Sequence, residues 1–481
     1  MNDLAANDRA TALVVDLDGT LAKTDVLIES VFRLLGRKPW LVFPMLGWLL
    51  HGKAAFKRRV AERVEVDAAR LPYRPEVVRL AQEARAQGRK VVLATAAAER
   101  HAQAIASHLG LFDEVISSSD SVNLSGAKKA ELLVKRFGER GFDYAGNAYA
   151  DLRIWRVARQ AILVNPAPGV KAGVRRGATL DQVLEDRRSF LASVVRQLRV
   201  HQWAKNLLVF LPAVAAHAVG DWQVLARCLL AFIAFSAVAS AVYVMNDLLD
   251  LQHDRQHPRK RFRPFAAGDL PLQMGVGLAP ALLIAGLAIG FTVSPLFALV
   301  LMVHLVTTIA YSLFLKGVAI LDVMVLASLY TLRMLGGSAV IEQRPSFWLL
   351  AFSTFLFLSL AMVKRYIELR HVVSEGQESA AGRGYRAGDT EIVAALGSAT
   401  GLMSVLILAL YIDSPKVAEL YRVPEALWLV CLVQLFWIAR VWLLAHRDEM
   451  HDDPVVFALQ DPVSIALGVI GLAVVACAAL A

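Results

Sequence analysis

From about residue 190 to its end, the chain is dominated by apolar stretches long enough to cross a membrane as helices. A helix needs about 20 apolar residues to cross the hydrocarbon core of a bilayer. Because the backbone must satisfy its own hydrogen bonds in lipid, a series of such stretches restricts this half to a helical bundle. We predict nine membrane helices, the first and sixth of them short, near residues 205–219, 223–245, 275–293, 295–314, 318–341, 347–363, 391–412, 425–445 and 462–481.

The composition of the whole chain agrees with a polytopic membrane protein. Of its 481 residues, 57% are hydrophobic, and the mean hydropathy is +0.49. The net charge of +9 does not indicate a nucleic-acid partner, because basic loops beside membrane spans face anionic lipid and phosphate ligands. All three cysteines lie in apolar stretches, so we expect no disulfide or zinc framework. Residues 1–12 are polar, which argues against a secretory signal peptide and for a cytoplasmic amino end.

Loop charges predict the orientation of the membrane half. With a cytoplasmic start, the outward loops contain only Arg344, Lys416 and Arg422 as basic residues. Most of the other loop lysines and arginines fall in inward loops, as the positive-inside rule requires. We therefore expect a multi-pass protein of the bacterial inner membrane, with its polar motifs on the cytoplasmic side. The inward loops are residues 246–274, 315–317, 364–390 and 446–461.

The amino-terminal half has a different pattern. Short apolar runs at Ala12–Val15 and Val91–Ala94 look like buried parallel strands. Amphipathic helical stretches, such as Glu76–Gln87 and Ala127–Arg136, alternate with them. This alternation predicts a doubly wound, Rossmann-like α/β domain over residues 1–190. The all-α membrane domain would then occupy residues 191–481.

An acidic segment follows the second predicted membrane helix. Asp247, Asp250 and Asp254 stand at positions i, i+3 and i+7, on one face of a helix. Carboxylate oxygens suit Mg²⁺, which keeps several waters and shares substrate phosphates. An acid cluster at the end of a membrane helix is costly and therefore indicates function. The basic side chains that follow are candidates to hold the rest of a phosphorylated ligand: Arg255, His257, Arg259, Lys260, Arg261 and Arg263.

Four segments carry a family resemblance. They are Arg199-x-x-Gln202-Trp203-x-Lys205-Asn206, the run from Asn246 to Pro264, Lys364-Arg365-x-x-Glu368-Leu369, and Met450-His451-Asp452-Asp453-Pro454. Together they resemble the UbiA superfamily of intramembrane transferases, and more narrowly its polyprenyl-phosphate phosphoribosyltransferases, over about residues 195–481. Prenyl-transferring members carry a second Asp-rich motif. Here Asp322 has no acid four residues before or after it, which is compatible with the phosphoribosyl branch.

The resemblance implies a reaction. Phosphoribosyl pyrophosphate would give 5-phosphoribose to a polyprenyl phosphate, forming polyprenyl-phosphoryl-5-phosphoribose and diphosphate. Mg²⁺ on the three aspartates would neutralise the departing diphosphate. Positioning and charge stabilisation would do the rest. Lys205 and Asn206 would meet the lipid phosphate, and Asp322 would orient the ribose or a metal-bound water. Further candidate substrate contacts are Asn246, Lys316, Lys364 and Arg365.

A second motif, Asp16-Leu17-Asp18-Gly19-Thr20, follows the first predicted strand. It resembles the first motif of haloacid-dehalogenase-type (HAD) phosphatases. The resemblance implies that Asp16 is the nucleophile and Asp18 the general acid and base. Thr95 would supply the phosphate-binding hydroxyl. Lys128, in preference to Lys129, would restrain the phosphorylated aspartate.

The last motif of that family is altered in this chain. It reads Gly146-Asn147-x-x-x-Asp151, with Asn147 where the family usually has an acid. An amide oxygen can still bind Mg²⁺, with less charge. The implied metal set is Asp16, Asp18, Asn147 and Asp151. A degenerate, structural or regulatory domain stays open as the alternative to an active phosphatase.

Two interpretations stay open for the segment between the first and second HAD motifs. Its core, Pro39–Leu50, is very apolar for the small helical cap expected around residues 30–75. It is either an interfacial helix that touches the bilayer or a cap helix that packs on its own domain.

The fusion suggests a relay, in which the HAD domain removes the 5-phosphate from the lipid product. The alternative function is prenyl transfer from a prenyl diphosphate to an aromatic or polyol acceptor. A scaffold or transporter is disfavoured, because the acids cluster at one face and the spans are nearly free of charge. Expected partners are phosphoribosyl pyrophosphate, polyprenyl phosphate and the bilayer, with no nucleic acid; a homo-oligomer is left open.

Overall fold

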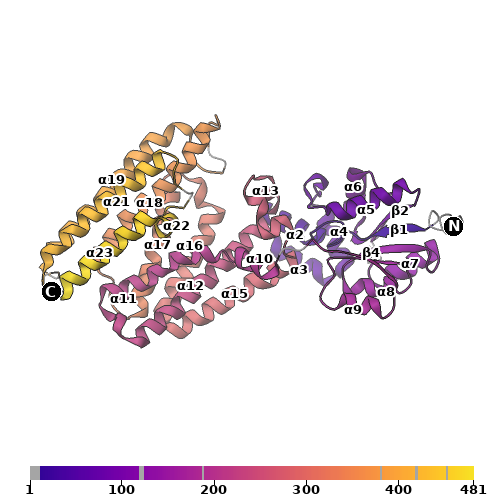
Figure 1. Cartoon of the computed structure of the whole chain (residues 1–481), viewed down its shortest axis with the longest axis horizontal. Helices are drawn as coiled ribbons and strands as arrows, with labels where there is room; N and C mark the ends of the chain where they lie inside the picture. The colour runs from indigo at the N-terminus through magenta and orange to yellow at the C-terminus, as the bar shows by residue number, and fades with distance from the viewer. Residues whose placement is uncertain are drawn as a thin grey trace. The chain divides into compact units, whose positions relative to one another are not determined.

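The computed structural model describes residues 11–118, 124–186, 189–379, 382–415, 417, 421–450 and 453–480. The chain divides into two compact units, which are coloured along the sequence in Figure 1. The first contains Met1–Leu198 and Tyr243–Ala279, and the second contains Arg199–Val242 and Pro280–Ala481. The first unit therefore includes the acidic segment as well as the amino-terminal half.

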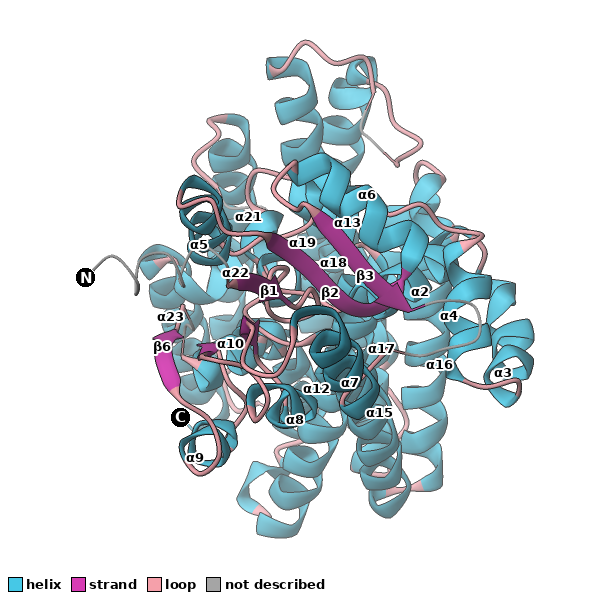
Figure 2. Ribbon diagram, turned by 90° about the vertical axis from the view of Figure 1, so that its right-hand side faces the viewer, coloured by secondary structure: helices cyan, strands magenta, loops and turns pink. Residues whose placement is uncertain are grey.

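A six-stranded parallel sheet forms the centre of the first unit, as the alternating pattern predicts (Figure 2). The strand order is β3-β2-β1-β4-β5-β6. This order places β1 beside both β2 and β4, so the loops after these three strands meet at one edge of the sheet. The strands are β1 Ala12–Val15, β2 Val91–Ala98, β3 Glu114–Ser118, β4 Phe142–Gly146, β5 Ala161–Val164 and β6 Leu180–Leu184.

Helices cover both faces of the sheet (Figures 1 and 2). Successive residues of a strand point to opposite faces. Leu13 and Val15 of β1 accordingly pack against α5 and α6, whereas Ala12 and Val14 pack against α7, α8 and α9. These helices are α5 Pro75–Ala86, α6 Glu99–Leu109, α7 Ala127–Phe137, α8 Leu152–Trp155 and α9 Val170–Arg175, with 3₁₀ turns η2 Ala68–Arg70 and η3 Tyr149–Asp151.

A small helical cap follows β1. Its helices α2, α3 and α4 share an apolar cluster of Leu34, Met45, Phe56, Val60 and Val64. Helix α2 also packs through Phe32 on the acidic segment. The cap comprises α2 Val26–Arg37, η1 Pro39–Leu41, α3 Val42–Leu50 and α4 Lys53–Ala61. The elements around the acidic segment are α10 Phe190–Gln197, α13 Leu251–Gln256, η6 Lys260–Phe262 and α14 Pro264–Ala267.

The remaining helices form the membrane half. Among the described residues, eight helices are long and apolar enough to cross a membrane. They contain α12 Trp222–Leu249, α15 Leu272–Val293, α16 Pro295–Leu313, α17 Leu321–Val340, α18 Phe347–Ser374, α19 Thr390–Ile412, α21 Trp428–His446 and α23 Pro462–Leu480. Short elements between them are η5 Ala218–Gly220, η7 Leu315–Gly317, η8 Ala387–Asp389, η9 Pro424–Leu427 and α22 Pro454–Gln460.

The first of the nine predicted spans, residues 205–219, is not a single α-helix. Its chain forms the 3₁₀ helix η4, Val200–Phe210, followed by the short helix α11, Leu211–Ala215. A 3₁₀ helix rises about 2 Å per residue and an α-helix about 1.5 Å, so the two extend over roughly 30 Å. That length matches the hydrocarbon thickness of about 30 Å without a 20-residue helix. The loop-charge orientation, which counts this segment as a crossing, stays a prediction.

Candidate active sites

Asp16 lies in a buried pocket at the end of β1. Its side chain accepts a hydrogen bond from the Lys129 ammonium on α7 (Nζ–Oδ1 2.7 Å). The same ammonium donates to the Ala94 carbonyl and contacts the Tyr144 hydroxyl, both at 3.1 Å. Lys129 is 4% exposed, so an unpaired charge there would be costly. The parallel strands β1, β2 and β4 thus bring together the first and third predicted HAD motifs.

The structure corrects the choice between Lys128 and Lys129. Lys129, and not Lys128, reaches Asp16. Neighbouring residues of a helix point about 100° apart, so only one of the pair can face the pocket. The helix begins after Gly126, which has a positive φ of 54°, and this turn sets which lysine faces inward.

The other predicted phosphatase groups occupy the same edge of the sheet. Asp18 Oδ1 accepts the first N–H of α2, from Val26, at 2.8 Å. Thr95 lies within β2, is fully buried, and accepts the Ala97 N–H at 3.0 Å. Thr20, which the motif contains but to which we assigned no role, has a buried hydroxyl with no hydrogen-bond partner among the described residues.

Asn147 and Asp151 have different roles. Both oxygens of Asp151 are occupied: Oδ2 accepts the N–H groups of Asn147 and Ala148 (3.0 and 2.9 Å), and Oδ1 accepts the Tyr144 hydroxyl (3.0 Å). Asp151 therefore holds the loop after β4 in place. The Asn147 amide lies against Gly19, where even a methyl group would meet its nitrogen at 2.2 Å. The amide is thus adjacent to the Asp16–Asp18 turn.

Burial sets the protonation of the two motif aspartates. Burial and the nearby Asp151 carboxylate raise the pKa of Asp16 to about 6, against the lowering effect of Lys129. Burial and the carboxylate of Asp25 raise the pKa of Asp18 well above its usual value. A raised pKa favours the protonated form of Asp18, which is the form that a general acid needs.

The second site is at the end of α12 that the loop charges predict to face the cytoplasm. Asp247 and Asp254 are each 2% exposed, and one Arg263 nitrogen, Nη1, contacts both carboxylates (3.1 and 2.7 Å). The Gln197 amide of α10 donates to Asp247 Oδ2 at 2.8 Å. The Gln197 Oε1 atom is buried and has no partner within the described part of the chain. Sequence reasoning missed Gln197, which lies 50 residues before Asp247.

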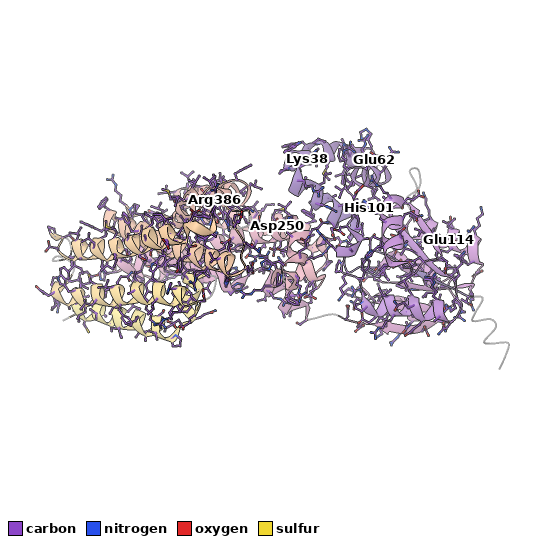
Figure 3. The ribbon with its side chains drawn as sticks, turned by 90° about the horizontal axis from the view of Figure 1, so that it is seen from above. Lys38, Glu62, His101, Glu114, Asp250 and Arg386 are labelled. Atoms are coloured by element: carbon purple, nitrogen blue, oxygen red, sulfur yellow. The ribbon has the colours of Figure 1, made fainter. Side chains whose placement is uncertain are left out.

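The three aspartates are not on one continuous helix. Helix α12 ends at Leu249, and Asp250 (φ −97°, ψ 9°) separates it from α13. The Asp250 N–H still bonds to the Asn246 carbonyl (2.9 Å), but its side chain is exposed (labelled in Figure 3). The break brings Asp254 to the same arginine as Asp247. Within the described part of the chain, no side-chain hydrogen bond or ion pair joins Asp250 to either aspartate, so its predicted metal role stays a prediction.

Arg255 is placed differently from the prediction of a substrate contact. Its guanidinium binds Glu29 of α2 with two bonds (2.6 and 3.0 Å) and donates to the carbonyls of Ala266 (3.1 Å) and Arg70 (3.3 Å). The Arg255 and Glu29 side chains are 8% and 7% exposed. We therefore correct its role: Arg255 fastens the acidic segment to the cap helix.

The remaining basic residues of the segment lie in an exposed turn. His257 Nδ1 accepts the backbone N–H groups of Arg259 (3.2 Å) and Lys260 (3.4 Å), which makes it a turn-forming residue. The side chains of Arg259, Lys260 and Arg261 are exposed. Their predicted role in binding a phosphorylated ligand stays a prediction.

In the second unit, Lys205 and Asn206 both have protein partners. Lys205, 8% exposed, forms an ion pair with Asp453. Asn206 donates to Ser236 Oγ (3.0 Å) and accepts from Arg333 Nε (2.8 Å). Arg333 is buried in α17 and was not among the predicted site residues. Within the fourth motif, Asp453 is described, whereas His451 and Asp452 lie outside the described residues.

Asp322 belongs to a compact polar network at the start of α17. It pairs with Arg365 of α18 (2.5 Å), and both side chains are fully buried. The Tyr385 hydroxyl donates to Asp322 Oδ1 at 2.7 Å, as does the backbone N–H of Val323. Arg365 also pairs with Glu368, which Arg383 approaches at 3.5 Å. Sequence reasoning missed Tyr385 because it comes from a loop 63 residues away.

Lys316 and Lys364 are partly exposed. The Lys316 carbonyl accepts from Arg383 at 3.5 Å. Lys364 and Lys205 lower the pKa of Asp453 despite its burial, which acts in the opposite direction. Within the described ranges, no three His, Cys, Asp or Glu side chains are grouped closely enough to form a metal site by themselves.

Comparison with protein families assigns the two parts of the chain to different groups. Residues 207–462 match the model of the UbiA prenyltransferase family. Residues 13–155 match the model of haloacid dehalogenase-like hydrolases. The first range includes the acidic segment and the helices from α12 to α22, and the second includes Asp16, Lys129 and the strands β2, β3 and β4.

Three relatives extend this picture. The uncharacterized protein y4nM of Sinorhizobium fredii is 38% identical over 468 residues, which is 97% of this chain and 90% of that protein. The nodulation protein NoeC of Azorhizobium caulinodans is 34% identical over 278 residues, 57% of this chain and 89% of that protein. The decaprenyl-phosphate phosphoribosyltransferase of Mycobacterium tuberculosis is 38% identical over 193 residues, 39% of this chain and 64% of that protein.

Proposed function

The chain belongs to the UbiA prenyltransferase family and carries a haloacid dehalogenase-like domain, and from this we propose that it transfers 5-phosphoribose from phosphoribosyl pyrophosphate to a polyprenyl phosphate. The observation that carries the proposal is the 38% identity over 193 residues with a decaprenyl-phosphate phosphoribosyltransferase. The products would be polyprenyl-phosphoryl-5-phosphoribose and diphosphate.

The second site offers suitable groups for a divalent cation. Two buried carboxylates, Asp247 and Asp254, both contact Arg263, and the buried Gln197 Oε1 atom has no hydrogen-bond partner among the described residues. Hard oxygen atoms of this kind suit Mg²⁺. Asp247, Asp254 and Gln197 would hold the ion, and the nearby exposed Asp250 is a further candidate. When bound, Mg²⁺ would neutralise charge on the diphosphate leaving group.

The residues of the chain would supply position and charge. Lys260 and Arg261, exposed beside the acidic site, would hold the phosphates of the donor. Arg263, which contacts both carboxylates, would add a further positive charge beside the same phosphates. An oxygen of the lipid phosphate then attacks the anomeric carbon as its bond to diphosphate breaks. Little covalent chemistry is asked of the protein, so the rate depends on orientation and electrostatics.

The HAD domain would remove the 5-phosphate from this product. The Asp16 carboxylate attacks phosphorus, the bond to the ribose O5 breaks, and Asp18 gives its proton to that oxygen. Water then attacks the phosphoaspartate, Asp18 takes a proton from the water, and inorganic phosphate leaves. The raised pKa of Asp18 supports the first proton transfer. Lys129 holds Asp16 in position, and the Thr20 and Thr95 hydroxyls would contact the phosphate.

A transfer assay tests the main proposal. Purified full-length protein is incubated with Mg²⁺, labelled phosphoribosyl pyrophosphate and polyprenyl phosphates of several lengths, and the lipid products are identified by mass spectrometry. We expect label in a ribosylated lipid. Transfer of a prenyl group from a prenyl diphosphate, with no use of phosphoribosyl pyrophosphate, would contradict the proposal and support prenyl transfer to an aromatic or polyol acceptor.

A single variant tests the phosphatase step separately. Asp16→Asn removes the nucleophile and should cause the 5-phosphorylated lipid to accumulate while its rate of formation is unchanged. Asp181→Asn, a change of the same kind on β6 and away from the pocket, is the control. If the wild type and Asp16→Asn accumulate the same lipid, the HAD domain acts on another substrate.

A further inference from the structure

The cap helix α3 has one packed face and one exposed apolar face. Met45 is 5% exposed and packs with Trp48 against Leu34 and Phe56. The opposite face exposes Phe43, Leu46 and Leu50, which are 75%, 60% and 88% exposed. These three residues stand at i, i+3 and i+7 and form a single stripe. The helix thus packs on its cap, as the second interpretation expects, and it also presents a large apolar face, which keeps the first interpretation open.

Basic residues surround this face. Residues 30–61 contain seven lysines or arginines and no aspartate or glutamate. Arg37, Lys38 and Lys53, which flank η1 and α3 on either side, are all exposed. An apolar face with Trp, Phe and Leu beside basic residues is typical of helices that lie in the interface of an anionic membrane.

The cap is also attached to the end of a membrane helix within the same unit. Phe32 of α2 packs with Val244 and Leu248, in the last two turns of α12. A methyl group on Gly36 would lie 3.3 Å from the Leu249 carbonyl. Helix α3 begins six residues after Gly36, so its apolar stripe is held near the point where α12 leaves the bilayer. Figure 1 shows α2 beside α13, the helix that follows α12.

We propose that α3 is an interfacial membrane helix, whose stripe of Phe43, Leu46 and Leu50 inserts into the anionic leaflet from which α12 emerges. The occupant of the exposed face is thus the bilayer itself. Lys38 and Glu62, labelled in Figure 3, lie at the two ends of the helical hairpin formed by η1, α3 and α4. Lys57, on α4 of the same hairpin, donates to the Ala96 carbonyl (2.7 Å) on β2, the strand that carries Thr95. The cap is therefore joined to the end of α12 through α2, and to the sheet that carries the HAD motifs through α4.

Depth measurements on the full chain test this proposal. Single cysteines at Phe43, Leu46 or Leu50, in a chain whose three native cysteines are replaced, carry an environment-sensitive fluorophore in nanodiscs that contain phosphatidylglycerol. We expect quenching by doxyl-labelled lipid and a loss of quenching by aqueous iodide at all three positions. Leu132→Cys is the matched control: Leu132 is an exposed leucine on α7 of the sheet domain, 40% exposed, and should show the reverse.

A second variant distinguishes lipid from other occupants. Arg37→Glu with Lys38→Glu and Lys53→Glu should reduce lipid quenching at position 46 in phosphatidylglycerol discs and have little effect in neutral phosphatidylcholine discs. Iodide quenching at positions 43, 46 and 50 equal to that at 132 would overturn the proposal. Nitroxide labels at the same cysteines test for a second copy: spin–spin coupling between two labelled chains would also overturn the proposal, because the face would then be covered by a second chain.

Discussion

The acidic site at the end of α12 and the network around Asp322 at the start of α17 each bury aspartates beside an arginine, but the arginine is shared differently. At α17, the single carboxylate of Asp322 contacts Arg365, the Tyr385 hydroxyl and a backbone N–H. At α12, one Arg263 nitrogen contacts two carboxylates, Asp247 and Asp254. Burial of an acid is therefore a poor guide to its role. We expect the Asp322–Arg365 pair to hold α17 and α18 together, and the two carboxylates at α12 to accept a cation.

The largest effect is expected from breaking the Asp322–Arg365 pair. Asp322→Asn removes the fully buried partner of Arg365 and leaves the more exposed Glu368, which should cost up to about 3–5 kcal/mol. The measurement is the fall in the thermal midpoint of the full chain in detergent. Asp448→Asn is the matched control, because the Arg370–Asp448 pair is exposed and is expected to contribute about 0–1 kcal/mol. Equal shifts for the two variants would contradict the role of the network.

A double variant sharpens the comparison. Replacing both charges, Asp322→Leu with Arg365→Met, should recover most of the lost thermal stability, since neither charge is left alone. If phosphoribosyl transfer recovers together with stability, Asp322 is structural. If stability recovers and transfer does not, Asp322 also contacts substrate, as the sequence prediction has it.

The next effect is on catalysis. Asp247→Asn keeps the shape of the side chain but removes a charge from the candidate cation site. We expect transfer to fall by about 10²–10³-fold, the size seen when one electrostatic group is removed from an active site. Asp269→Asn is the control: Asp269 pairs with the exposed Arg196 at 3.4 Å and lies outside the site. Undiminished transfer by Asp247→Asn would remove the assignment of the acidic site.

A smaller effect is expected from Gln197. Gln197→Met removes the bond to Asp247 and the oxygen offered to the cation. The Mg²⁺ concentration for half-maximal transfer should rise about 10–100-fold, while the maximal rate changes less. Ser193→Ala, on the same helix and equally buried, controls for packing of α10. An unchanged Mg²⁺ requirement for Gln197→Met would show that its role is limited to orienting Asp247.

Sequence patterns located the HAD pocket well because its groups follow strands. Parallel strands end at a common edge, so a motif after β1 and a motif after β4 must meet. The family comparisons confirm both resemblances and the fold. The lysine was misassigned by one position because the phase of α7 depends on the turn at Gly126.

The acidic segment was harder to predict. The i, i+3, i+7 spacing assumes one straight helix, but the backbone breaks at Asp250. The partners that decide the role of each aspartate come from distant positions, such as Gln197 for Asp247 and Tyr385 for Asp322. No local spacing can reveal such pairs. The same holds for Arg255, whose partner Glu29 is 226 residues away in sequence.

The α2 helix has a consequence for how such a chain can evolve and be engineered. Its first N–H group donates to Asp18, and its Phe32 packs on the end of α12. Its Glu29 forms an ion pair with Arg255. If the two domains were expressed as separate proteins, the apolar surface between α2 and the end of α12 would become exposed. Arg255 would lose its partner Glu29. The two domains thus share α2 as a common structural element, and replacing either domain requires that this helix be transferred with it.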